Sequence, residues 1–331
     1  MEYRSYADLA DTVVRNAHHV PLDVDLVVGV PRSGIIPASI LALQLNRPFQ
    51  ELEAYLAGCP IKVGRTAKAV ISTERPVRRI LVVDDSVASG ESARAVRARL
   101  RLEKPGVEVV FLAVYGTTSH SAHVDIIFEV VESPRIFQWN LMRHSRLADA
   151  CFDIDGVLCH DPEHSQNDDG ENYIKFLLKA KPLLRSGTRI EHLVTSRLEK
   201  YRPQTEQWLR ENGVEYGKLW MLDLPTAEER RRRGAHASFK AKIYRETGSC
   251  IFVESEGRQA QEIADLSQKP VLSIEDQAIL WPAGSGKNAQ RRHRLRQSMK
   301  SDGPVRVMAR SVARALLGSS NIAKIRRSLS R

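Results

Sequence analysis

Two adjacent carboxylates, Asp84 and Asp85, follow an apolar run in the segment ILVVDDSVASGESA. A carboxylate accepts hydrogen bonds, so a pair of them suits the two hydroxyl donors of a sugar diol. The loop that follows is built mainly of small residues, whose backbone amides can approach a phosphate closely at the start of a helix; it comprises Ala88, Ser89, Gly90, Glu91 and Ser92. The segment therefore predicts a site for a phosphorylated sugar.

A second candidate anion site lies earlier in the chain, in the peptide VVGVPRSGIIPA. The apolar run predicts a strand, and IIPA begins a predicted helix, so the loop between them places backbone amides and a helix N-terminus together. Arg32 adds a positive charge to that loop. The same order of strand, loop and helix recurs about fifty residues later at Asp84.

These side chains need a scaffold, and the chain predicts one from its apolar runs. Val- and Ile-rich runs without alternation are typical of strands covered on both faces, as in a parallel α/β sheet. We expect strands at 26–30, 80–85, 107–116 and 124–131 and helices at 35–45 and 91–102. The pattern then restarts, with strands expected at 150–155, 189–196 and 250–255.

We therefore predict an α/β protein of two consecutive Rossmann-like parallel-sheet domains with a basic helical C-terminal tail. The length of 331 residues fits two domains of ordinary size. The predicted boundaries are 1–146 for the first domain, 147–282 for the second and 283–331 for the tail.

The first pair of motifs resembles the type I phosphoribosyltransferases. GVPRSG is similar to the pyrophosphate loop of that family, and VVDDSVASGES is similar to its signature for phosphoribosyl pyrophosphate (PRPP). The resemblance covers about residues 20–140 and implies a phosphoribosyltransferase fold. It implies that Asp84 and Asp85 hold the ribose hydroxyls and that Ala88 to Ser92 hold the 5-phosphate. Pyrophosphate would contact the first loop, with Mg²⁺ bridging, through Arg32, Ser33 and Gly34.

One position departs from the family. Purine-using members usually carry a third acid in the phosphate loop, which acts as a base toward the purine, and here that position is Ala88. The departure argues against a nucleobase acceptor. Phe137 and Trp139, in IFQWN, are candidates for stacking on a planar base or a sugar face; equally, they could be aromatic residues packed in the domain join.

The second domain contains FDIDGVL (152–158), which resembles the nucleophile motif of the haloacid dehalogenase superfamily. The resemblance implies that Asp153 attacks phosphorus to form an aspartyl-phosphate. It implies that Asp155 protonates the leaving oxygen and then activates water, while Mg²⁺ offsets the charge of carboxylate and phosphate.

Further parts of that resemblance follow in order along the chain. Thr195 and Ser196 end HLVTS and supply a hydroxyl donor to the phosphate. Lys240 is favoured over Lys242 as the cation that neutralises developing charge. Glu254 is favoured over Glu256 as a metal ligand where the family usually has Asp, so the expected Mg²⁺ ligands are Asp153, Asp155 and Glu254.

The positive charge is concentrated in the tail. Residues 283–331 contain 13 Lys and Arg against a single acid, so their net charge is +12. The whole chain has a net charge of +10, which leaves −2 for residues 1–282. A periodic apolar face (305–316) beside arginines predicts an amphipathic helix. Three interpretations remain open: contact with an anionic membrane surface, packing on the body with a solvated basic face, and nucleic-acid binding, which is the least favoured.

Composition limits the remaining classes. The chain is 42% apolar, which is normal for a folded chain and argues against a disordered or fibrous one. We expect neither a signal peptide nor a membrane-spanning helix. Four scattered cysteines predict a reduced, cytoplasmic protein, peripheral at the inner face of the membrane if the tail binds lipid.

Together the motifs predict a bifunctional ribofuranosyltransferase, similar to the dual-domain enzymes of bacterial surface-polysaccharide assembly. Ribose 5-phosphate would pass from PRPP to a glycan hydroxyl, and the second domain would remove the 5-phosphate. We expect the glycan acceptor to be lipid-linked. The general base of the transfer is not evident, and Asp85 is one candidate. We also expect a homodimer. Two alternatives remain: nucleoside formation from a nucleobase, and a PRPP-responsive regulator.

Overall fold

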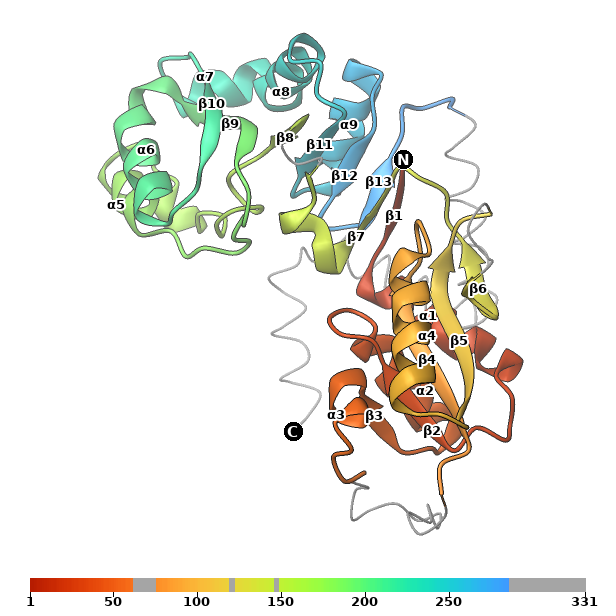
Figure 1. Cartoon of the computed structure of the whole chain (residues 1–331). Coiled ribbons are helices and arrows are strands. Elements are labelled where there is room, and N and C mark those ends of the chain that lie inside the picture. The colour runs from red at the N-terminus through yellow and green to blue at the C-terminus, as the bar shows by residue number, and fades with distance from the viewer. Residues whose placement is uncertain (62–75, 119–122, 146–148, 286–331) are drawn as a thin grey trace, which may run out of the picture. The chain divides into compact units, whose positions relative to one another are not determined.

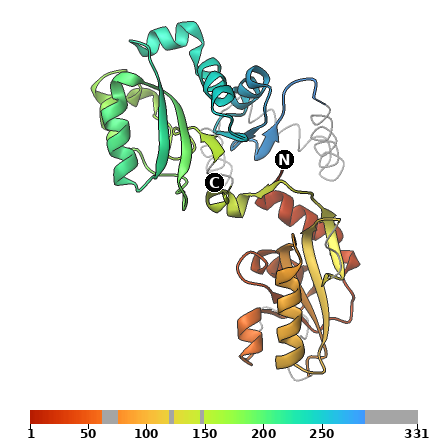
Figure 2. The same cartoon turned by 45° about the horizontal axis from the view of Figure 1, so that its top comes forward.

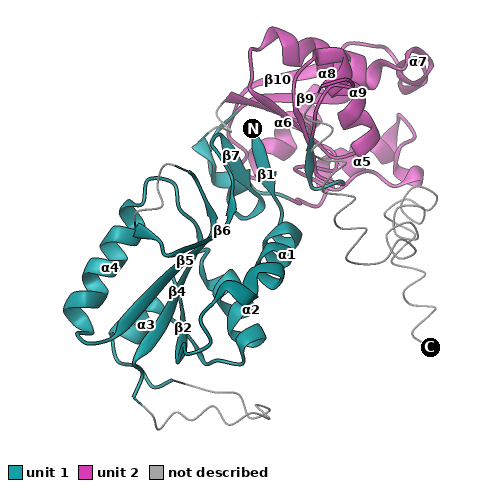
Figure 3. Cartoon of the chain, turned by 90° about the vertical axis from the view of Figure 1, so that its right-hand side faces the viewer, with its two compact units in different colours: residues 1–148, 184–190, 276–279 teal, residues 149–183, 191–275, 280–331 magenta. Residues whose placement is uncertain are grey.

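The computed structural model describes residues 1–61, 76–118, 123–145 and 149–285, and it divides the chain into two compact units. Unit 1 comprises residues 1–148, 184–190 and 276–279; unit 2 comprises residues 149–183, 191–275 and 280–331 (Figure 3). The main division, between residues 148 and 149, lies near the predicted boundary. The predicted tail lies outside the described residues from residue 286 onward.

Unit 1 is an α/β unit around a five-stranded parallel sheet of order β3-β2-β4-β5-β6 (Figure 1). Its sheet strands are β2 (Leu26–Gly29), β3 (Phe49–Glu51), β4 (Arg79–Ser86), β5 (Glu108–Gly116) and β6 (Ile126–Val130). Its α-helices are α1 (Tyr6–Asn16), α2 (Ile35–Leu45), α3 (Leu52–Leu56) and α4 (Glu91–Glu103). A separate two-stranded parallel sheet pairs β1 (Glu2–Arg4) with β7 (Arg135–Phe137).

Helices cover both faces of this sheet, which explains its uninterrupted apolar strands. Val27, Leu81 and Val83 point into one core layer with residues of α1 and α2. Leu26, Val28, Ile80 and Val82, which alternate with them, point into the opposite layer with residues of α3 and α4. Figure 3 shows these two pairs of helices on opposite sides of the strands.

A second α/β arrangement has the strand order β10-β9-β8-β11-β12-β13 (Figure 1), and Figure 2 shows it from another side. It belongs to unit 2 except for residue 190 of β9 and residues 278–279 of β13, which belong to unit 1. The strands are β8 (Ala150–Phe152), β9 (Ile190–Leu198), β10 (Tyr216–Leu222), β11 (Ile251–Glu254), β12 (Val271–Ser273) and β13 (Ala278–Leu280). The α-helices are α5 (Glu171–Lys179), α6 (Arg202–Glu211), α7 (Ala227–Arg233), α8 (Ala235–Glu246) and α9 (Gly257–Ser267). The pairs β9·β8, β8·β11 and β11·β12 are parallel.

The predicted α/β class with parallel sheets is confirmed. Helix α2 has the predicted bounds, because Asn46 adopts a left-handed conformation that ends it. Short elements such as β1, β3 and β7, three residues each, were not predicted, since three residues are too few to show a period. In the part of the chain that is described, no helix is long and apolar enough to cross a bilayer.

Candidate active sites

The first candidate site lies where the strand order of unit 1 reverses. The chain leaves β2 toward β3 on one side and continues from β4 toward β5 on the other. Helices then diverge from the carboxyl ends of β2 and β4, and a crevice at such a switch point is where open α/β sheets bind ligands. The loop 30–34 follows β2, and Asp84 and Asp85 lie near the end of β4. The two motifs predicted to share a ligand are thus on adjacent strands.

Gly34 lets the first loop lie directly on β4. A Cβ atom there would be 2.6 Å from the carbonyl oxygen of Val83, 2.7 Å from that of Val30 and 2.9 Å from Cα of Asp84. All three neighbours are backbone atoms, so no side-chain movement could make room. Only glycine fits this contact.

The rest of this loop is more open. Arg32 is exposed and donates a hydrogen bond to Oδ1 of Asn140 (2.8 Å), and Ser33 is half-buried. The Pro31–Arg32 peptide bond is cis. Asn140 was not predicted as a partner of this loop, because nothing in the sequence relates residues that far apart.

The paired carboxylates are buried: Asp84 is 8% exposed and Asp85 is 5% exposed. Oδ1 of Asp84 accepts a hydrogen bond from the amide of Asp85 (2.8 Å). Burial, and then the charge of Asp85, raise the pKa of Asp84 to about 8. The pair therefore retains a proton near neutral pH, so it offers a donor as well as acceptors to sugar hydroxyls.

The predicted phosphate loop joins β4 to α4. Val87 is buried and its amide donates to the carbonyl of Tyr115 (2.8 Å), whereas Ala88 and Ser89 are exposed. Gly90 has φ of +77° and precedes the helix, a conformation that favours glycine. Glu91 and Ser92 are exposed in the first turn of α4, where helix amides have no intrahelical partner.

Arg135, which was not predicted, holds this loop through hydrogen bonds. Its guanidinium donates to the carbonyls of Val131 (2.9 Å) and Val87 (2.8 Å). Burial lowers the pKa of Arg135, while the charge of Asp85 opposes that shift. An arginine in the short strand β7 has no sequence signature, so its role could be found only from the structure.

The two aromatic candidates differ in exposure. Phe137 is 7% exposed and stacks between Trp139, with centroids 4.8 Å apart, and Tyr115, 5.4 Å away. Trp139 is half-buried, and its indole N–H donates to Oδ2 of Asp85 (2.6 Å). Phe137 is therefore a core residue, whereas Trp139 touches a predicted ligand-binding carboxylate directly.

The second candidate site lies at the corresponding place in unit 2. The order β10-β9-β8-β11-β12 places β8 centrally, with later strands added on both sides. The carboxyl ends of β8, β9 and β11 therefore lie together, at another reversal of strand order. They bring together Asp153, Thr195 and Glu254, which were predicted from three distant motifs.

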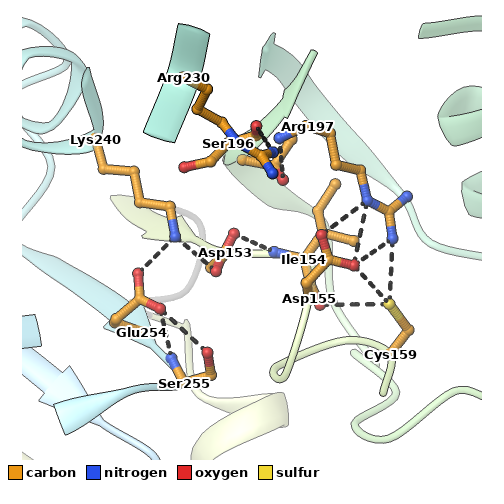
Figure 4. A network of polar contacts seen from close by, with 11 residues as sticks. Asp153, Ile154, Asp155, Cys159, Ser196, Arg197, Arg230, Lys240, Glu254 and Ser255 are labelled. Atoms are coloured by element: carbon orange, nitrogen blue, oxygen red, sulfur yellow. Dashed lines mark hydrogen bonds and ion pairs between the residues drawn. The ribbon is translucent and has the colours of Figure 1, made fainter. Parts of the chain in front are cut away.

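Lys240 connects two of these carboxylates (Figure 4). Its Nζ atom donates to Oδ2 of Asp153 (2.7 Å) and to Oε2 of Glu254 (2.8 Å). All three residues are buried, with at most 4% of their surface exposed. Burial, Glu254 and Asp155 raise the pKa of Asp153, and Lys240 only partly opposes this. Burial would lower the pKa of Lys240, but Asp153 and Glu254 raise it, so the lysine stays charged.

Asp155 faces a different cation. The guanidinium of Arg197 donates from Nη2 to Oδ1 (2.6 Å) and from Nε to Oδ2 (3.0 Å), and Arg197 is 1% exposed. Burial alone would raise the pKa of Asp155, but Arg197 outweighs it and the pKa is lowered. The ion pair favours the carboxylate form, which suits a base and opposes the predicted role as proton donor. Arg197 was not singled out in the sequence, because its partner is 42 residues away.

The predicted Mg²⁺ ligands do not form one ligand set. Lys240 occupies an oxygen of both Asp153 and Glu254, and Arg197 occupies both oxygens of Asp155. Within the described ranges, no group of three or more His, Cys, Asp or Glu side chains is arranged to hold a metal ion. The observed side-chain arrangement therefore does not fit that set.

The two predicted hydroxyls are both buried. Thr195 is fully buried, and its Oγ1 accepts a hydrogen bond from the amide of Arg197 (3.3 Å). Ser196 is 8% exposed, and its Oγ has no hydrogen-bond partner among the described residues. Ser196 is therefore the hydroxyl that is free to bind a ligand. The less favoured Lys242 and Glu256 both lie on the surface.

Comparison with known proteins identifies the first unit. Residues 3–141 match the family described as phosphoribosyl transferase domain. A purine phosphoribosyltransferase from Pyrococcus horikoshii Ot3 is 18% identical, with 42% of this chain and 92% of that chain covered and a TM-score of 0.32. The Helicobacter pylori xanthine-guanine-hypoxanthine phosphoribosyltransferase is 21% identical, with 43% and 99% covered and a TM-score of 0.33.

An orotate phosphoribosyltransferase from Aeropyrum pernix is 21% identical, with 38% of this chain and 71% of that chain covered and a TM-score of 0.28. No curated protein matches the chain. The family match includes both loops of the first site and the aromatic segment that contacts it. Residues 3–141 therefore form a phosphoribosyl transferase domain.

Proposed function

We propose that the chain transfers ribose 5-phosphate from PRPP to a hydroxyl group of a glycan in unit 1 and removes the 5-phosphate in unit 2. The observation that carries the proposal is the buried pair Asp84–Asp85 at the switch point of a phosphoribosyl transferase domain. The second buried cluster, Asp153–Lys240–Glu254, supports the phosphatase step.

PRPP binding follows from the groups around the first switch point. Asp84 and Asp85 would hold the ribose hydroxyls, and the loop ending at Gly90 would bind the 5-phosphate through backbone amides. Arg32 is exposed in the loop after β2 and would pair with the pyrophosphate. Mg²⁺ would offset the negative charge of the pyrophosphate in this site.

The acceptor is inferred from what the loop lacks. Ala88 is exposed where a base toward a purine ring would be expected, and a methyl group cannot move a proton. A glycan hydroxyl needs only a proton acceptor, for which Asp85 remains our candidate. The Trp139 ring is half-buried against Asp85, and it would contact the acceptor through its aromatic face.

The transfer step balances without another reactant. The bond between C1 of the ribose and the pyrophosphate oxygen breaks, and the pyrophosphate keeps the electron pair. An acceptor oxygen attacks C1 from the opposite face, which turns the α-linked donor into a β-ribofuranoside. The proton of the acceptor hydroxyl passes to the base. The products are the ribosyl 5-phosphate glycan and pyrophosphate.

The second step would use Asp153. A carboxylate oxygen would attack phosphorus, the bond to the 5-oxygen of ribose would break, and that oxygen would take up a proton from a water molecule. Water then attacks the aspartyl-phosphate and releases inorganic phosphate. Lys240, held between Asp153 and Glu254, would offset the added negative charge. Asp155 is paired with Arg197 and suits the activation of water better than the protonation of the leaving oxygen.

The two reactions together yield a ribosyl group without its phosphate, which suits a polysaccharide better than nucleotide synthesis. Nucleoside formation and PRPP sensing remain the alternatives, and no contact in either site favours them. Lipid-linked acceptors, membrane contact through the tail and a homodimer belong to the same proposal. They rest on the sequence alone, because the tail lies outside the described residues.

Pyrophosphate release from PRPP tests the acceptor. The protein is supplied with PRPP and Mg²⁺ and either a nucleobase (hypoxanthine, guanine, adenine, uracil or orotate) or a panel of synthetic oligosaccharides. We expect release with an oligosaccharide only. Rapid release with a base, and none with any glycan, would shift the conclusion to nucleoside synthesis.

Asp153→Asn tests the order of the two steps. The variant retains the transferase site, so mass spectrometry should find the acceptor carrying ribosyl 5-phosphate. An unphosphorylated ribosyl product from this variant would show that Asp153 is not the nucleophile.

A further inference from the structure

Two buried polar atoms near Asp153, one in Arg230 and one in Ser196, have no hydrogen-bond partner among the described residues. Arg230, in α7, is 8% exposed and donates from Nη1 to the carbonyl of Ser196 (2.7 Å). Its Nε has no hydrogen-bond partner in the described part of the chain, and neither has Oγ of Ser196. Figure 4 shows Arg230 and Ser196 next to each other, in the same view as Lys240 and Asp153.

Arg230 also differs in its charge balance from two other buried cations of unit 2. Lys240 is paired with Asp153 and Glu254, and Arg197 is paired with Asp155. No ion pair links Arg230 to a carboxylate among the residues described, although its surface neighbours Arg232 and Arg233 on α7 both pair with Glu229. Within the described part of unit 2, the buried guanidinium of Arg230 is thus left without a carboxylate partner.

A neutral histidine lies close to Arg230. His236 is half-buried at the start of α8, and burial, followed by the charges of Arg230 and Lys240, lowers its pKa to about 4. The imidazole is therefore neutral at physiological pH and does not compete with Arg230 for an anion.

A buried charge without a counterion is costly, and a buried donor without an acceptor adds to the cost. Both penalties disappear if an anion with several oxygen atoms binds there. The planar guanidinium presents donors in a fork that matches phosphate oxygens, and a serine hydroxyl can donate to a further oxygen.

We propose that Arg230 and Ser196 bind the phosphate group of a phosphomonoester beside Asp153. This inference rests on the proposed phosphatase function of unit 2. The side chain is held for that purpose by a capped helix: Oγ1 of Thr226 accepts from the amide of Glu229 (3.2 Å), and Gly234 ends α7 with φ of +56°.

The substitution Arg230→Gln tests the site, with Arg231→Gln as its matched control. Arg231 is the next residue on the same helix and is exposed, so both variants lose one positive charge from α7. The probe is inorganic phosphate, titrated calorimetrically into the full-length protein. A charged hydrogen bond is worth about 1.5–3 kcal/mol, so Arg230→Gln should weaken phosphate binding by at least about tenfold. Ser196→Ala should weaken it less, and Arg231→Gln should leave it unchanged.

A thermal readout keeps the proposal testable if Arg230→Gln folds poorly. Arg230→Met removes a buried charge that has no counterion, so without phosphate its melting temperature should equal or exceed that of the wild type. Phosphate should raise the melting temperature of the wild type and of Arg231→Gln, but not that of Arg230→Met. A structural role would instead make Arg230→Met unstable while its response to phosphate persists.

Turnover separates this inference from the proposed function. If Arg230→Gln and Arg231→Gln bind phosphate with the affinity of the wild type, the inference is overturned. If phosphate binding depends on Arg230 but the wild type hydrolyses neither ribose 5-phosphate nor 4-nitrophenyl phosphate, the phosphate site stands and the phosphatase function fails.

Discussion

Lys240→Met should destabilise unit 2 strongly and in a pH-dependent way. Nζ of Lys240 lies 2.7 Å from Asp153 and 2.8 Å from Glu254, and the three side chains are almost fully buried. Removing one member of a buried ion pair typically costs about 3–5 kcal/mol, because the partner charge stays buried. The variant could instead protonate one carboxyl group. At pH 7.5 that costs about 1.4 kcal/mol for each pH unit above a normal pKa near 4, or about 5 kcal/mol. The two routes give a similar loss.

The pH dependence has a definite sign. Lys240 is the group that lowers the pKa of Asp153 against burial, so the pKa of Asp153 in the folded state should rise when the lysine is removed. The folded variant then binds more protons than the folded wild type above the wild-type pKa. Its deficit in the free energy of unfolding should therefore shrink as the pH falls, by at most about 1.4 kcal/mol per pH unit.

The assay is native-state hydrogen exchange of peptides that cover β8, β9 and β11, measured from pH 8 to pH 6. Lys242→Met is the matched control, since that side chain lies on the surface with Glu246 4.0 Å away, and such pairs contribute about 0–1 kcal/mol. Adding Asp153→Asn to Lys240→Met should restore part of the stability. The reasoning is refuted if Lys240→Met loses no more than Lys242→Met, or if its deficit grows as the pH falls.

The remaining predictions concern unit 1. Asp84→Asn with Asp85→Asn should abolish pyrophosphate release from PRPP and leave hydrolysis of 4-nitrophenyl phosphate unchanged; loss of both activities in a folded protein would contradict separate sites. Gly34→Ala should destabilise unit 1 by about 1–3 kcal/mol in thermal unfolding, because the added methyl group meets only backbone; an unchanged melting temperature would show that the loop can move away from β4. Trp139→Phe frees Oδ2 of Asp85 from the indole N–H, and one hydrogen bond is worth about 0.5–1.5 kcal/mol. The Trp139→Phe variant should therefore bind PRPP roughly 2- to 10-fold more tightly than the wild type. Weaker binding would mean that Trp139 orients Asp85 for the ligand.

The motifs at strand ends could be recognised from the sequence because their chemistry is local. Asp84 and Asp85 follow their apolar run directly, and Asp153 follows another, so each carboxylate was predicted at the carboxyl end of a strand. Parallel strands bring such ends to one edge of the sheet, which is why motifs about fifty residues apart could be assigned to one site. Helix α2 was equally clear, since its apolar run has a defined start and stop.

Partners between distant side chains could not be predicted in the same way. The sequence suggested Asp155 as a proton donor, and only the structure places Arg197 against it. Arg135, Asn140 and Arg230 have no motif of their own, so their contacts with the two sites became visible only in three dimensions.

What the sequence by itself determined is the order of elements, the parallel α/β class and the strand ends that carry charge, because apolar periodicity and turn residues are local properties. The tertiary structure decided which cation faces which carboxylate and which donors are left without a partner. Those pairings arise where separate strands and helices pack together, and there a shift of a few ångströms changes the partner of a buried charge. Arg230 and Arg231 are neighbours in the chain, yet one is buried beside Asp153 and the other faces solvent, because a helix turns successive residues toward different sides.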